Sequence, residues 1–74
     1  MKNAGANEAA HKLINFVIQT AKAKGLTISK HAELAELEKS YVSKIYRGKV
    51  FPALPNLTKF VKAAGLEIVL VQPT

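Results

Sequence analysis

Residues 25–49 read GLTISKHAELAELEKSYVSKIYRGK, and this stretch decides the fold. Its apolar residues recur at helical intervals in two short segments, which predicts two helices joined by a sharp turn. Thr27 is a suitable N-cap for the first helix, which we expect to end at about Ala35 or Glu36. We expect the second helix over residues 39–46.

The second helix is predicted to have two different faces. Val42 and Ile45 fall on its inner side, which leaves serines and lysines on its outer side. Glu38 precedes the helix with a charge that suits a helix N-terminus, although a short hydroxyl caps better, so Ser40 is an alternative cap that would start the helix two residues later. Two short helices around a sharp turn, with a cationic outer face on the second, are the layout of a helix-turn-helix reader of DNA.

Two longer amphipathic segments flank this pair. Apolar spacing over residues 8–24 predicts a helix with Asn7 as its N-cap and Gly25 as its stop. A fourth helix is expected to begin near Pro55, which suits a first helical position, and to run to about Ala64. We therefore expect an all-α domain of four helices over residues 7–65, preceded by a flexible N-terminus, residues 1–6.

After this domain the period changes, because residues 68–71 are apolar without interruption and three of the four are β-branched. This predicts a short C-terminal β-strand within residues 66–72. Since no other segment reads as a strand, its partner is expected to be the same strand of a second copy across a two-fold axis. The alternative is an extended tail tucked under the helices. The residues expected to mediate dimerisation are Leu66, Ile68, Val69, Leu70 and Val71.

Composition and charge restrict the function classes. A chain of 74 residues makes one domain with a thin core, and the absence of cysteine excludes disulfides and cysteine metal sites. The net charge is +6, and residues 39–62 contain six basic residues and no acid, which favours a polyanionic partner over a merely solubilising surface. The N-terminus lacks a secretory signal pattern and the apolar runs are far below the ~20 residues of a membrane span, so we expect a soluble cytoplasmic protein, nucleoid-associated when bound to DNA.

Nothing in the sequence indicates catalysis, so we expect neither an enzyme nor a cofactor. His11 and His31 lie on different predicted helices without metal-ligand spacing, and each is better explained as a core or surface residue. Phe16, Phe51 and Phe60 are expected in the core.

The chain resembles the phage repressor and Cro type of helix-turn-helix proteins, also called the XRE type, over about residues 13–66. The resemblance is carried by Leu26 and Thr27 at the opening of the pair, Ala32 at the small helix-contact position, Val42 and Ile45 as the inward pair, Gly48 and Lys49 after the reading helix, and Pro52 with the helix from Leu54 to Ala64. It implies a lambda-repressor-like fold and binding to double-stranded DNA. The ending GLEIVLVQP is similar to the tails of HipB-like antitoxins, whose C-terminal strands pair between subunits.

Four positions depart from the family pattern. Ile28 replaces a frequent glutamine, His31 a leucine, Glu36 the turn glycine, and Glu38 the usual Ser or Thr cap. These departures bear on local geometry and leave the overall pattern in place.

The predicted site has two parts. The expected base-reading residues are Lys39, Ser40, Tyr41, Ser43 and Lys44, and the expected phosphate-binding residues are Thr27, Ser29, Lys30, Arg47 and Lys49. One hypothesis is a homodimeric transcriptional regulator, a repressor or autorepressor, on an inverted-repeat operator. The alternative is an antitoxin that also binds a toxin protein, with helix one or the strand pair as its docking surface. A basic amphipathic membrane binder is disfavoured, because the apolar stripes are needed for a core.

Overall fold

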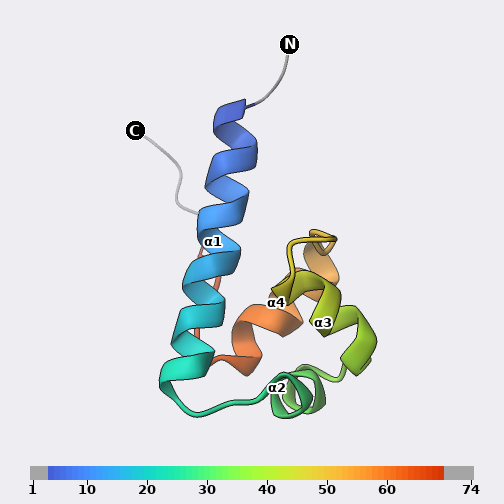
Figure 1. Cartoon of the computed structure of the whole chain (residues 1–74). Coiled ribbons are helices and arrows are strands. Elements are labelled where there is room, and N and C mark those ends of the chain that lie inside the picture. The colour runs from blue at the N-terminus through green and yellow to red at the C-terminus, as the bar shows by residue number, and fades with distance from the viewer. Residues whose placement is uncertain (1–3, 70–74) are drawn as a thin grey trace.

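The chain folds into four α-helices around one small core (Figure 1). The computed structural model describes residues 4–69, and the side chains of residues 8–69. The helices are α1 (Ala4–Ala23), α2 (Ile28–Ala35), α3 (Lys39–Tyr46) and α4 (Leu54–Ala63). The long α1 stands along one side, and the three short helices form a group beside it (Figure 1). The prediction of an all-α domain is confirmed for the described residues.

The predicted helix ends are close to the observed ones for the three short helices. Pro55 lies in the first turn of α4, as its fixed φ favours. The expectation for α1 was wrong at its start, because the helix begins at Ala4 and Asn7 therefore lies inside it. Alanines in this segment have the highest helix propensity and extend the helix past the predicted cap. Residues 4–6 are thus helical rather than part of a flexible terminus, and residues 1–3 lie outside the described part of the chain.

The α3 helix begins at Lys39, so the alternative start with Ser40 as its cap was wrong. Glu38 is the N-cap, with extended backbone and without a side-chain hydrogen bond to the helix. The carboxylate still lies near the positive end of the helix dipole, where a negative charge is favourable.

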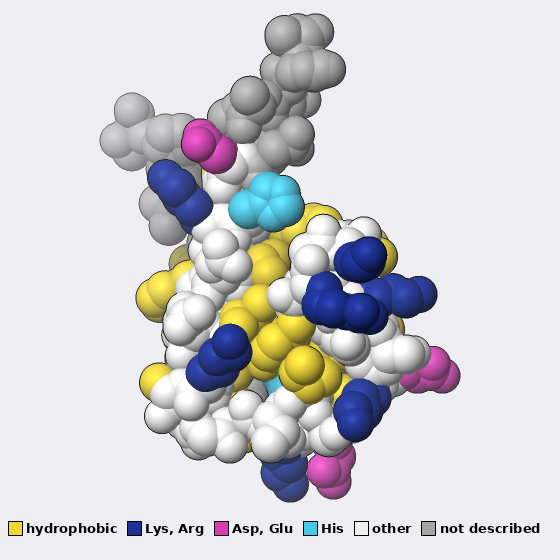
Figure 2. Space-filling model, in the orientation of Figure 1, with side chains coloured by type: hydrophobic (Ala, Val, Ile, Leu, Met, Phe, Trp, Pro, Cys, Tyr) yellow, Lys and Arg dark blue, Asp and Glu magenta, His cyan; other side chains and the backbone are white. Residues whose placement is uncertain are grey.

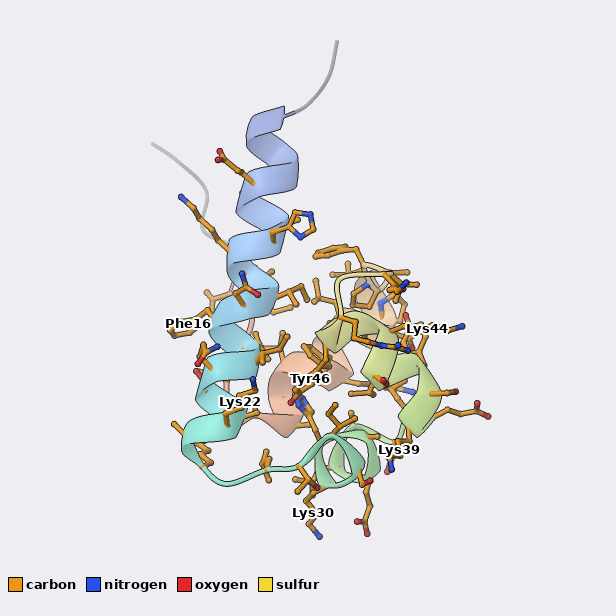
Figure 3. All side chains as sticks on the ribbon, in the orientation of Figure 1. Phe16, Lys22, Lys30, Lys39, Lys44 and Tyr46 are labelled. Atoms are coloured by element: carbon orange, nitrogen blue, oxygen red, sulfur yellow. The ribbon has the colours of Figure 1, made fainter. Side chains whose placement is uncertain are left out.

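The core lies where α1 meets the other helices. Its members are buried apolar side chains from every helix, with Val17, Val42, Phe60 and Ala64 wholly inaccessible to solvent. Phe60 is thus a core residue as predicted, whereas the prediction was wrong for Phe16 and Phe51, which are exposed. Phe16 falls between the buried positions of α1 and points away from the bundle (Figure 3).

Residues 66–69 have neither helical nor strand structure in the single chain. Leu66 and Ile68 pack against the core, which agrees with the alternative of a tucked tail, while Val69 is 69% exposed. Leu70 and Val71 lie outside the described residues. Pairing of this segment with a second copy stays a prediction, because a strand needs a partner before its hydrogen bonds can form.

None of the described helices combines the length and the apolar character that crossing a membrane requires.

Candidate nucleic-acid interface

The turn between α2 and α3 is made without glycine. Glu36 adopts the left-handed conformation, with φ 60° and ψ 40°, and it is the one non-glycine residue with positive φ in the described chain. The amide of Glu36 donates to the carbonyl of Glu33 (3.1 Å), and the amide of Leu37 donates to that of Ala32 (3.0 Å). This is the Schellman pattern by which a helix usually ends at glycine. The sharp turn predicted between the two helices is therefore present, at the cost of a conformation that L-residues rarely adopt.

The inner side of α3 fastens it to the bundle. Val42 is wholly buried and Ile45 is 1% exposed, which confirms the predicted inward pair. On the outer side, Lys39, Ser40 and Lys44 are exposed and Ser43 is half-buried. In an α-helix, positions separated by three or four residues share a face, so the serines and Lys44 form one outer stripe and Lys39 lies at its flank.

Tyr41 differs from the other four predicted base-reading residues. Its ring is half-buried against the core, and its Oη accepts a hydrogen bond from Asn56 Nδ2 of α4 at 3.3 Å. This contact directs the hydroxyl toward α4. No local pattern in the sequence indicates a role for Asn56, because the contact joins residues that are fifteen positions apart.

His31 holds the end of α3 against α4. Its ring is wholly buried, with Nδ1 2.7 Å from Tyr46 Oη and Nε2 2.9 Å from the carbonyl oxygen of Phe60. A carbonyl can only accept, so Nε2 carries the proton and Nδ1 accepts from the Tyr46 hydroxyl in the neutral ring. The imidazole also stacks on the Phe60 ring, with centroids 4.3 Å apart. His31 is therefore a satisfied core residue, and the exposed His11 is a surface residue, as predicted.

The same burial affects Tyr46. Burial raises the pKa of its hydroxyl above the ordinary value of 10.0, because the charged phenolate is disfavoured away from water. The neutral hydroxyl that donates to His31 is thus the form that the fold favours.

The N-terminus of α2 brings together the first group of predicted phosphate-binding residues. Thr27 caps the helix as expected, since its Oγ1 accepts from the amide of Lys30 at 3.0 Å. Ser29 and the Lys30 side chain are exposed beside it. Amides in the first turn of a helix lack intrahelical partners and favour an anion. The Lys30–Glu33 ion pair (3.5 Å) is exposed on both sides and so contributes little.

The second group follows α3 directly. Arg47 ends the helix, Gly48 has φ 75°, and Lys49 comes after it, and all three are exposed. The amide of Lys49 donates to the carbonyl of Lys44 at 2.8 Å, which closes the helix end and holds the start of this loop against it.

Positive charge gathers on this side of the molecule. Dark-blue lysine and arginine side chains cluster over α3 and the loop that follows it (Figure 2). Lys30, Lys39 and Lys44 project from the α2 and α3 side (Figure 3). A solvent-exposed cationic face on a firmly packed helix can bind phosphates and reach base edges.

Comparison with protein-family models, with curated proteins and with solved structures finds no match to this chain. Among the described residues, no group of three or more His, Cys, Asp or Glu side chains is arranged to hold a metal ion.

Proposed function

We propose that this protein is a sequence-specific regulator that binds double-stranded DNA through a helix-turn-helix formed by α2 and α3. The observation that carries the proposal is the division of α3, which buries Val42 and Ile45 and exposes Lys39, Ser40 and Lys44. An α-helix fits the major groove of B-DNA, so its outer side chains reach the base edges there. Lysine donates to the acceptors of guanine, and serine bonds to several bases.

The surroundings of α3 support the same binding mode. The capped N-terminus of α2, with Ser29 and Lys30, and the loop with Arg47 and Lys49 offer amides and cations to the DNA backbone. Such contacts set the register of the protein on the duplex and make affinity fall with salt.

The regulator is proposed to act as a homodimer on an inverted-repeat operator. We propose that this operator lies in its own promoter, so that the protein is a repressor of its own gene. Two reading helices related by a two-fold axis require half-sites about one helical turn of DNA apart. A second subunit also supplies the burial that a 74-residue chain lacks.

The second candidate function is that of an antitoxin which binds a toxin protein as well as DNA. The exposed apolar side chains of Leu13, Phe16 and Val69 favour a protein partner in addition to DNA. Inhibition of a toxic neighbouring gene product by this chain, measured in a co-expression assay, tests this function.

The proposal of DNA binding is tested by selecting duplexes from a randomised library and measuring affinity at two salt concentrations. We expect one inverted-repeat sequence to emerge and to bind at least about 1,000-fold more tightly than scrambled duplex. Affinity for both duplexes is expected to fall with salt. Equal affinity for selected and scrambled duplexes at both salt concentrations contradicts the proposal.

A further inference from the structure

An apolar groove lies between α1 and the C-terminal segment. Its volume is about 250 Å³, and it is lined on one side by Leu13 and Phe16 of α1 and on the other by Leu66, Ile68 and Val69. We refer to Leu13, Phe16 and Val69 as the α1–tail face.

The α1–tail face is exposed in the single chain. Leu13 is 37% exposed, Phe16 61% and Val69 69%. Phe16 projects from the side of α1 that faces away from the rest of the bundle (Figure 3). Large apolar side chains gathered around one groove mark an interaction surface more often than scattered ones do.

The charge around this groove favours a second copy as the occupant. Glu67 is the one charged residue in its lining, whereas the groove between α2 and α4 is lined by Lys59, Lys62 and Glu36. Two copies that each carry a net charge of +6 repel one another wherever lysines meet lysines. The α1–tail face lets them meet with no lysine or arginine in the groove.

The backbone beside the groove favours the same occupant. Within the described chain, the amides of Glu67, Ile68 and Val69 donate to no backbone carbonyl. Ile68 and Val69 in this segment are apolar and β-branched, the residue type that favours strand pairing. The same segment of a second copy offers matching amides, carbonyls and apolar side chains.

We infer that the α1–tail face is a self-association surface, covered by the same face of a second copy across a two-fold axis. Leu13 and Phe16 of α1 thereby join the C-terminal residues in the interface, although the sequence predicted the C-terminal residues alone. The inference rests on the proposed function in one respect, the pairing of two subunits, and it does not depend on DNA binding.

This placement leaves the candidate DNA interface uncovered. Phe16 and Lys44 lie on opposite outer sides of the molecule in Figure 3, one on α1 and the other on α3. A copy seated on the α1–tail face therefore does not hide the lysines of α3.

Sedimentation equilibrium of the whole chain, without DNA, tests the inference. The test variant is Phe16→Ser with Val69→Ser, and the matched control is Leu54→Ser, which removes a side chain that is 65% exposed outside the groove. We expect the unaltered chain and the control to dimerise with similar dissociation constants. For the test variant we expect a dimer dissociation constant on the order of 100-fold higher or more. Helical circular dichroism and melting of each variant report whether the monomer stays folded, as expected for exposed positions.

Equal dimer dissociation constants for the test variant and the unaltered chain overturn the inference. A strictly monomeric unaltered chain also overturns it and leaves a different protein as the occupant. Failure of the DNA proposal would look different. A chain whose dimerisation is weakened by Phe16→Ser, but which prefers no duplex, would support the self-association surface and contradict the proposed function.

Discussion

The outer faces of α3 and α1 differ in what they present to solvent. Both helices bury an apolar stripe in the same core, yet α3 exposes Ser40 and Lys44 where α1 exposes Leu13 and Phe16. The buried stripes explain why both helices form and where they pack. From the exposed residues we propose partners of different chemistry, a polyanion for α3 and an apolar surface for α1.

The two helices also differ in how the bundle holds them. Beyond its apolar stripe, the C-terminal end of α3 is tied through Tyr46 to His31, and through His31 to α4. A helix that reads base edges must be presented rigidly, since small displacements lose hydrogen bonds.

The largest effect is expected for His31→Leu. The substitution leaves the buried carbonyl of Phe60 without its donor and removes the partner of Tyr46, so we expect a loss of about 1–3 kcal/mol in the free energy of unfolding. Denaturant unfolding measures it. The matched substitution on the other helix, Phe16→Ser, should change monomer stability by no more than about 0.5 kcal/mol, because that side chain is exposed.

A double-mutant cycle separates the two bonds of His31. Tyr46→Phe alone is expected to destabilise by about 1 kcal/mol, and to have no effect when Leu already occupies position 31. Additive effects, or a His31→Leu variant as stable as the unaltered chain, contradict the role given to this histidine.

A smaller effect of opposite sign is expected at the turn. Glu36→Gly should stabilise the chain by roughly 1 kcal/mol, because glycine adopts a φ of 60° without the steric penalty of a side chain. The control is Glu33→Gly, inside α2, which should destabilise by about 0.5–1 kcal/mol. Thermal unfolding of both variants gives the sign, and destabilisation by Glu36→Gly would show that the glutamate side chain matters more than its backbone.

The smallest effect is expected in alkaline solution. The pKa of Tyr46 is raised in the folded chain, so above pH 10 the unfolded chain loses this proton first and the folded chain retains it. The contribution of the Tyr46 hydroxyl to the free energy of unfolding is therefore fully present below its ordinary pKa. It is lost as the pH rises through the pKa of this group in the folded chain. Above about pH 10, the melting temperature of the Tyr46→Phe variant should fall less steeply with pH than that of the Tyr41→Phe variant. Equal slopes would contradict the assignment.

Local patterns account for what the sequence predicted well. Thr27, Gly48 and the spacing of Val42 and Ile45 act within one or two turns, and they placed α2 and α3 to within a residue. What the sequence did not predict depends on contacts distant in the chain. The position of His31 between Tyr46 and Phe60 joins three helices, and no spacing in a single sequence encodes it.

Phe16 shows a second limit. Its apolar side chain indicates burial, and the single chain leaves it exposed, because the stripe of α1 that meets the other helices passes through Ile14, Val17 and Ile18 instead. The apolar character of such a side chain predicts that it is buried. It does not specify whether the same chain or another chain buries it. The exposure of Lys39 and Lys44 was predictable, because a lysine side chain needs no partner to remain in solvent.

The affinity ratio between selected and scrambled duplex, measured for Lys39→Ala with Lys44→Ala, tests most directly whether α3 reads bases. The control is Lys59→Ala with Lys62→Ala on α4, which removes the same charge elsewhere. We predict that the α3 variant loses its preference by on the order of 100-fold while the control keeps its preference and binds both duplexes more weakly. An undiminished preference in the α3 variant would contradict the account.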